Sequence, residues 1–198
     1  RVRHQLLDVR VVRLLLVLPD DRHGRAVEDG VALAEQEEVR RARGAAEAVG
    51  RVVHLAGGWQ PGSKVAEGTA EQWEKAMSVN LYTAVNIARS LTPLVRTARG
   101  CFVFVASEAA LPGASVAGMS AYATAKQGVV TLMRALAGEE RRNGVRANAI
   151  APAAIRTASN ERAMGADADY VEREAVADAI AWLCSPAAAA VTGQVIHL

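Results

Sequence analysis

The segment CFVFVAS, residues 101–107, decides the fold that the sequence predicts. Its first five residues are apolar without interruption, and a serine ends the run. Such a continuously apolar strand is typical of a parallel sheet that is covered by helices on both faces. Similar short apolar runs are predicted as strands at 11–18, 51–58, 144–152 and 192–198.

Helical patterns lie between these strands. Thr69 is followed three residues later by Gln72, which is typical of a capping box at the start of a helix. Residues 29–33 are predicted as a weak strand and residues 156–173 as irregular. Helices are predicted over 35–49, 69–95, 120–138 and 174–183. The alternation of strands and helices predicts a doubly wound, mostly parallel α/β sheet.

Composition excludes several classes of protein. The chain has 198 residues, of which 51% are hydrophobic and 22% charged, so a disordered polymer is excluded. A net charge of +2 gives no reason to expect nucleic acid as a partner. No apolar run reaches the ~18 residues of a membrane span. The two cysteines, Cys101 and Cys184, are expected to be buried thiols, so we expect a cytoplasmic protein. The four histidines and two cysteines lack the spacing of a metal site.

Tyr122 and Lys126 are the sharpest chemical signal in the chain. Their spacing places both on one face of a helix, about one turn apart. An ammonium beside a phenol lowers the phenol pKa from ~10, and the pair could then exchange a proton with a hydroxyl or carbonyl. Ser107 could hold the substrate oxygen, because ligands of open α/β sheets bind beyond the carboxyl ends of the strands. Taken alone, the Tyr–Lys pair is more often structural, and a serine at this place is more often a cap.

Several ordered motifs then accompany this pair. They are LAGG (55–58), MSVNLYTA (77–84), FVAS (104–107), YATAK (122–126), NAIAPAAIRT (148–157) and TGQVIHL (192–198). From about residue 51 to 198 the chain therefore resembles the short-chain dehydrogenase/reductase family. It departs from the family pattern at His54 and Leu55, which replace two asparagines, and at Ala153, which replaces a glycine. The usual Asp-Gly-Gly ending is also absent.

The resemblance implies a role for each matched residue. Tyr122 is the general acid/base, and Lys126 lowers its pKa and holds the nicotinamide ribose. Ser107 hydrogen-bonds the substrate oxygen, and Asn80 keeps the helix and a proton-relay water in place. The residues implied to contact the cofactor are Ala56, Gly57, Tyr122, Lys126, Pro152, Ile155 and Thr157.

The resemblance also implies the kind of protein. We expect a single Rossmann-like domain over 1–198 and an oxidoreductase. It would transfer a hydride between NAD or NADP and a small-molecule carbonyl or alcohol. In this family the helices that start near Thr69 and Ser120 pack across a dimer axis, so a homodimer or homotetramer is expected. AGGW (56–59) and SNERAMGADADY (159–170) resemble a subgroup that includes dihydropteridine reductase. Trp59 is interpreted either as a cap over the core or as a flat wall for a planar substrate.

The glycine-rich loop of a dinucleotide fold is not found in residues 1–50. If residues 11–18 form the family's second strand, the first strand, the glycine loop and the first helix are lacking, and the sheet would have an open centre. The chain could be a fragment, the gene product could be truncated, or residues 1–10 could replace the opening; the abrupt end at Leu198 favours incompleteness at both ends. Asp20 and Asp21 could accept the ribose hydroxyls of NAD, and Arg22 and Arg25 could bind the 2′-phosphate of NADP. A solvated turn is the more common role for residues of this kind.

Two functions follow as hypotheses. The first is the oxidoreductase, which depends on the complete set of Asn80, Ser107, Tyr122 and Lys126. The second is a non-catalytic relative that lacks the cofactor site and serves as a scaffold or an oligomerising binding module. The missing glycine loop and the altered residues at 54, 55 and 153 favour the second.

Overall fold

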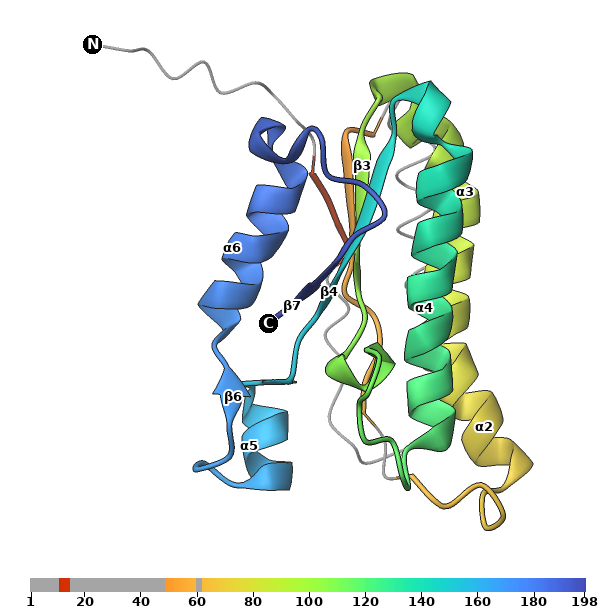
Figure 1. The fold of residues 1–198 in the computed structure, drawn as a ribbon, viewed down its shortest axis with the longest axis vertical. Coiled ribbons are helices and arrows are strands. Elements are labelled where there is room, and N and C mark those ends of the chain that lie inside the picture. Colours follow the sequence, from red (N-terminus) through yellow and green to blue (C-terminus); the bar gives the residue numbers. More distant parts are fainter. Residues whose placement is uncertain (1–10, 15–48, 60–61) are drawn as a thin grey trace.

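A five-stranded parallel sheet forms the centre of the protein. In this computed structural model, residues 11–14, 49–59 and 62–198 are described. All neighbouring strands are parallel, which confirms the predicted α/β fold (Figure 1). The strands, in spatial order, are β1 (Val11–Leu14), β2 (Arg51–His54), β3 (Cys101–Val105), β4 (Arg146–Ala151) and β7 (Val195–His197).

β1 pairs directly with β2, and this corrects one expectation. Val12 is in register with Val52, so the backbone of residues 11–14 occupies the position beside β2 where a gap was expected. The open centre is therefore wrong for this sheet, because its five described strands are hydrogen-bonded without a break. Residues 35–48 of the helix predicted over 35–49 lie outside the described residues, and Val49 itself is not helical. The strand predicted over 29–33 and the ribose-recognition candidates Asp20, Asp21, Arg22 and Arg25 also lie outside them.

The helices follow the predicted pattern with two differences. The first is that the helix expected over 69–95 is made of three segments, and the second is that α5 lies in a stretch predicted as irregular. Gln72 N donates to Thr69 Oγ1 at 3.3 Å and Thr69 N donates to Gln72 Oε1 at 3.1 Å, which confirms the capping box. The helical segments are α2 (Ala70–Met77), the π-helical turn η1 (Ser78–Tyr82), α3 (Thr83–Ala98), η2 (Glu108–Ala110), α4 (Ser120–Glu139), η3 (Arg141–Asn143), α5 (Ala158–Met164), α6 (Arg173–Cys184) and η4 (Pro186–Ala188).

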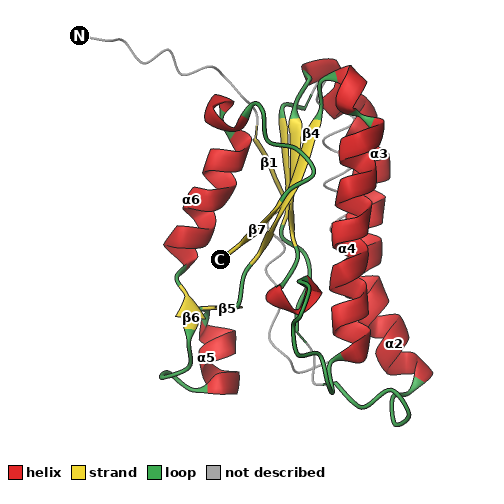
Figure 2. Cartoon of the chain, viewed as in Figure 1, coloured by secondary structure: helices red, strands yellow, loops and turns green. Residues whose placement is uncertain are grey.

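The sheet separates two layers of helices. α3 and α4 lie side by side on one face and α6 lies on the other (Figures 1 and 2). Phe102 and Phe104 of β3 belong to the core beneath α3 and α4, where their rings stack with centroids 5.9 Å apart. Val103, between them, belongs to the smaller core beneath α6, together with Ile150. This alternation explains why β3 is apolar throughout.

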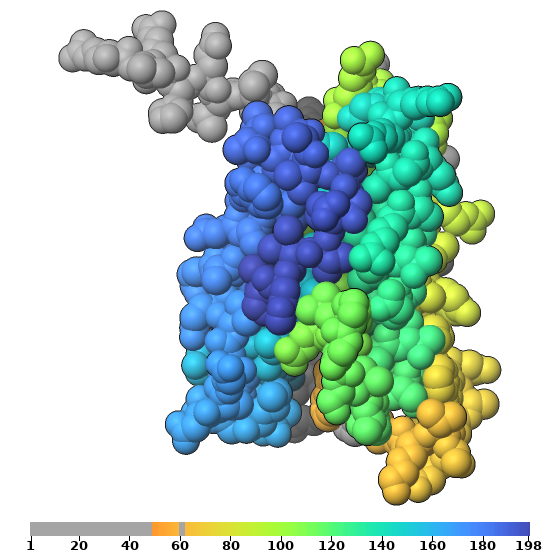
Figure 3. Space-filling model, in the orientation of Figure 1, coloured from red at the N-terminus to blue at the C-terminus, as the bar shows by residue number. Residues whose placement is uncertain are grey.

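The carboxyl ends of the strands gather elements that carry the candidate site. η2 follows β3, a short parallel pair of β5 (Ala154–Ile155) and β6 (Tyr170–Val171) follows β4, and α2 and α5 lie at the same end (Figure 1). In the space-filling view the segment that follows β3 lies between α5 and the start of α4 (Figure 3). Within the described part of the chain, no helix is long and apolar enough to cross a membrane.

Candidate active site

Asn80 lies in the π-helical turn η1 and connects it to the loop after β2. Its side chain is fully buried. Asn80 Nδ2 donates to Ala76 O and to Gly58 O, each at 3.2 Å, and Asn80 Oδ1 accepts from Gly58 N at 3.0 Å. The carboxamide of Asn80 therefore bonds backbone groups of α2 and of the loop after β2. A π-helical turn shifts the register of a helix by one residue, and turns of this kind are frequent at functional sites.

Gly57 makes the close approach of three segments possible. Its φ of +135° is a conformation that residues with a β-carbon rarely adopt. A β-carbon at this position would lie 2.7 Å from Asn80 Oδ1 and 2.8 Å from Lys126 Nζ. The loop after β2, the η1 turn and α4 thus meet at a point where only glycine fits. Ala56, the residue before it, is buried.

Ser107 lies near enough to Tyr122 to influence the pKa of its phenol. Ser107 follows β3 and caps η2, where its Oγ accepts from Ala109 N at 3.3 Å. The hydroxyl proton of Ser107 is not used in that bond, and the Ser107 side chain lowers the pKa of Tyr122, which lies near the start of α4. Glu108 N donates to Pro152 O at 3.0 Å and connects this segment to the end of β4.

The electrostatics of Tyr122 differ from the expectation. Burial raises the pKa of Tyr122 above 10.0, more than the Ser107 side chain lowers it, and Glu108 raises it further. The ammonium of Lys126 lies 5.9 Å from the centroid of the Tyr122 ring. The predicted lowering of the phenol pKa is therefore not found in this geometry, and the phenol is protonated at neutral pH.

Lys126 is buried, with only 4% of its surface exposed. Its Nζ donates to Val105 O, at the end of β3, at 3.0 Å. Burial lowers the pKa of Lys126 to about 8, because an ammonium that is removed from water is less stable in its charged form. One hydrogen bond leaves two of the three ammonium protons available for further acceptors.

The other residues expected to contact a cofactor lie at the same end of the sheet. Pro152 is buried after β4, and Ile155 ends β5. Thr157 caps α5, with its Oγ1 accepting from Asn160 N at 3.1 Å, and Asn160 Nδ2 donates to Ile155 O at 2.8 Å. Trp59 is 54% exposed, so its interpretation as a cap over the core is wrong.

His54 is the site residue that the sequence analysis did not single out for a role. It is fully enclosed at the end of β2, and its Nε2 lies 3.1 Å from Thr83 Oγ1. Since the Thr83 hydroxyl donates to Val79 O at 3.0 Å, His54 Nε2 carries the proton and donates to Thr83. His54 Nδ1 is then a buried acceptor without a hydrogen-bond partner. Burial, aided by the charge of Lys126, lowers the pKa of His54 to about 3.

A family comparison agrees with this architecture. Residues 33–198 match the family model described as enoyl-(acyl carrier protein) reductase. The chain belongs to the short-chain dehydrogenase/reductase family. The sequence resemblance is thereby confirmed at the level of the family.

Individual members of the family show how far the similarity extends. A tropinone reductase homologue of Arabidopsis thaliana is 36% identical over 141 residues, which are 65% of this chain and 52% of that protein. A 2,5-dichloro-2,5-cyclohexadiene-1,4-diol dehydrogenase of Sphingobium indicum is 32% identical over 150 residues, 68% of this chain and 59% of the other. The chain spans about half the length of the curated relatives that it matches.

A solved structure of the family has the same arrangement. The 3-oxoacyl-[acyl-carrier protein] reductase of Brucella melitensis with bound NAD aligns with a TM-score of 0.70 and 28% identity. The alignment covers 83% of this chain and 66% of that one.

Replacing Gly57 by alanine tests the packing at this point. We expect Gly57→Ala to lower the free energy of unfolding by about 1–3 kcal/mol, because the new methyl group overlaps Asn80 and Lys126 and φ is unfavourable. The matched control is Gly138→Ala in α4, where a β-carbon meets nothing within 4 Å. This change should be neutral or raise stability by up to about 1 kcal/mol. Urea denaturation measures both, and equal stability of the two variants would contradict the packing described.

The buried imidazole predicts a pH-dependent stability. Because the pKa of His54 falls from 6.5 unfolded to about 3 folded, the unfolded chain binds the extra proton and stability declines as pH falls below 6.5. Relative to His54→Gln, which has no titratable group, the wild type should lose up to about 1.4 kcal/mol per pH unit below 6.5. Urea denaturation of both proteins from pH 7 to about pH 4.5 measures this difference. If the free energy of unfolding changes with pH equally in both proteins, His54 is not buried as a neutral ring.

Proposed function

We propose that this chain belongs to an oxidoreductase that transfers a hydride between a nicotinamide dinucleotide and a small-molecule carbonyl or alcohol. The proximity of the Ser107 side chain to the Tyr122 phenol, beside the buried ammonium of Lys126, carries the proposal. These groups come from two elements that meet beyond the carboxyl ends of the strands, where ligands of open α/β sheets bind.

Proton transfer is the step that these side chains would perform. Ser107 would donate a hydrogen bond to the carbonyl oxygen of the substrate, and Tyr122 Oη would donate its proton to the same oxygen during reduction. The raised pKa of Tyr122 favours this direction at neutral pH, because the phenol then holds the proton that it must supply. In alcohol oxidation the same oxygen would accept the proton.

The residues present fit a nicotinamide cofactor. Gly57 leaves room for a close approach of backbone to ligand, and Lys126 keeps ammonium protons for ribose hydroxyls. Asn80 would hold the loop that carries Gly57. When bound, the cofactor supplies or accepts the hydride. The remaining contacts that we propose come from Ala56, Pro152, Ile155 and Thr157.

The relatives support this class of reaction. The Brucella melitensis reductase holds NAD, and the Sphingobium indicum relative is a diol dehydrogenase. The proposal makes no choice between NAD and NADP as the cofactor. A homodimer or homotetramer and a cytoplasmic location stay predictions, as does the narrower resemblance to the dihydropteridine reductase subgroup. The non-catalytic alternative gains no support, because a scaffold has no need for a serine near a tyrosine beside a buried lysine.

Removal of the phenolic oxygen tests the proton-transfer role. With NADH or NADPH and a panel of ketones and aldehydes, Tyr122→Phe should lower kcat/KM by about 10²- to 10⁴-fold, because no other group would supply the proton. Tyr82→Phe, at an exposed residue of η1, is the matched control and should retain wild-type turnover. Equal rates for both variants would exclude Tyr122 as the acid.

The pH dependence of reduction tests Lys126. Since the pKa of Lys126 is about 8 and that of Tyr122 lies above 10.0, the lysine loses its proton first as pH rises. The value of kcat/KM should therefore be constant near pH 7 and fall above about pH 8. Lys126→Arg keeps the charge at all these pH values, so its alkaline decline should move to higher pH, whatever its absolute rate. If kcat/KM of Lys126→Arg falls over the same pH range as that of the wild type, the group that titrates is not Lys126.

A further inference from the structure

A second group of reactive side chains lies at the opposite end of the sheet from the candidate active site. It consists of Cys101, Cys184, Arg51 and Arg146, hereafter the dithiol cluster. Cys101 begins β3, and its partners in register on the two neighbouring strands are Arg51, which begins β2, and Arg146, which begins β4. In-register residues of a sheet project to the same face. Val103, two residues after Cys101, packs beneath α6, so this face is the α6 face.

The two arginines hold the last turn of α6 over the start of β3. Arg51 Nε donates to Cys184 O at 3.0 Å, and Arg146 Nη1 donates to Leu183 O at 2.8 Å. Carbonyls at the carboxyl end of a helix lack partners within the helix, so these bonds fix the position of the helix end. Cys184, the last residue of α6, is thereby placed near Cys101, and the two thiols lie close enough for each to shift the pKa of the other.

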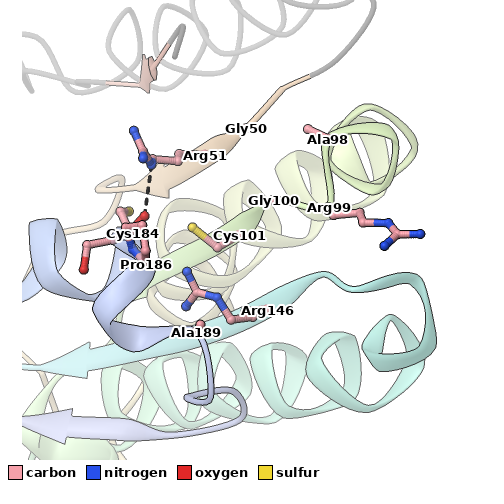
Figure 4. A pocket seen from close by; sticks show the side chains of 11 residues that line it. Gly50, Arg51, Ala98, Arg99, Gly100, Cys101, Arg146, Cys184, Pro186 and Ala189 are labelled. Carbon is pink, nitrogen blue, oxygen red and sulfur yellow. Dashed lines mark hydrogen bonds between the residues drawn. The ribbon is translucent and has the colours of Figure 1, made fainter. Parts of the chain in front are cut away.

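A cavity of about 270 Å³ opens onto both thiols. The two cysteines and both arginines line it, together with the backbone of Gly50 and Gly100 (Figure 4). Cys101 is otherwise enclosed, with 2% of its surface exposed, and Cys184 is half-buried. A small molecule can therefore reach the pair through this cavity.

One of the two thiols is more acidic than an ordinary cysteine. The neighbouring Cys184 thiol lowers the pKa of Cys101 to about 7, and the charges of Arg146 and Arg51 add to this effect, although burial opposes it. The pKa of Cys184 is raised by its neighbour and by burial. At neutral pH the pair thus combines a thiolate with a thiol, which is the combination that forms a disulfide after oxidation.

We propose that Cys101 and Cys184 are a redox pair that forms an intramolecular disulfide on exposure to a hydroperoxide. The Cys101 thiolate attacks the terminal oxygen of the hydroperoxide, whose O–O bond breaks and whose alkoxide leaves and takes up a proton. The resulting sulfenic acid on Cys101 is attacked by the Cys184 sulfur. The S–S bond forms, and the sulfenic hydroxyl leaves as water with the proton of the Cys184 thiol. Two thiols are oxidised, and one hydroperoxide is reduced to an alcohol and water, or to two waters for hydrogen peroxide.

The disulfide would connect the start of β3 to the end of α6. The loop that it closes contains Ser107, Tyr122 and Lys126, so oxidation would constrain the unfolded chain over most of the candidate active site. We therefore expect the oxidised protein to unfold at a higher temperature than the reduced one. This site is independent of the proposed oxidoreductase activity, because no cofactor or substrate takes part.

The test uses the reduced, folded full chain and a stoichiometric amount of hydrogen peroxide. Because the chain has two cysteines, the number of free thiols per chain should fall from two to zero. The mass should fall by two hydrogens, independently of protein concentration, and peptide mapping should recover Cys101 linked to Cys184. The rate should rise with pH through about 7, as the Cys101 thiolate forms.

Two variants separate the roles of the two thiols. In Cys184→Ser the sulfenic acid on Cys101 should persist and be captured by dimedone, whereas Cys101→Ser should give little capture at the same peroxide concentration. Thiols that stay free in the wild type, or disulfides found only between chains, would overturn the proposal. Equal capture by the two variants would overturn the assignment of Cys101 as the attacking group.

Discussion

The space beside the α-carbon of Gly57 is the constraint on which the candidate site depends. A β-carbon there would collide with the carboxamide of Asn80 and the ammonium of Lys126, which approach from two different helical segments. Asn80 then fixes the backbone of Gly58 with both of its polar ends. The loop after β2 can follow this path only because residue 57 has no side chain and adopts a positive φ. The backbone at the end of β2, the η1 turn and α4 are thus held together at one point.

Burial determines the protonation states around this point. Lys126 donates to a strand-end carbonyl, which stabilises its charge only in part, so burial still lowers its pKa. His54 remains neutral, and its Nδ1 lacks a partner in an enclosed setting. Tyr122 keeps its proton for the same reason. A site that favours neutral groups and retains unused donors and acceptors is suited to a polar ligand that completes its hydrogen bonds.

Much of this fold could be predicted from the sequence because its central strand, β3, is apolar on both faces. The run from Cys101 to Val105 alternates between the core beneath α3 and α4 and the core beneath α6, and a parallel sheet is the arrangement that accommodates it. The order of the motifs predicts that Ser107 lies beside Tyr122. The direction of the pKa shift of Tyr122 could not be predicted, because it depends on burial, which the spacing of residues does not reveal.

Other features depend on three-dimensional contacts that leave little trace in the sequence. The π-helical turn around Asn80 interrupts a stretch that is helical by pattern, and α5 is a short helix that begins at the Thr157 cap. Cys101 and Cys184 each suggest a buried thiol, but their proximity arises only when α6 is seated on the starts of β2 and β4. The pairing of β1 with β2 could not be inferred from residues 1–50, since strand order is a property of the whole sheet.

The most direct measurement of the central claim is the fate of the hydride. The protein would be incubated with a reactive ketone and with NADH or NADPH that carries deuterium at C4 of the dihydronicotinamide, and the alcohol would be analysed by mass spectrometry and NMR. The account predicts that deuterium appears on the carbinol carbon of the alcohol. A bound, labelled cofactor whose deuterium never reaches any carbonyl carbon, across a broad panel of ketones and aldehydes, would contradict it.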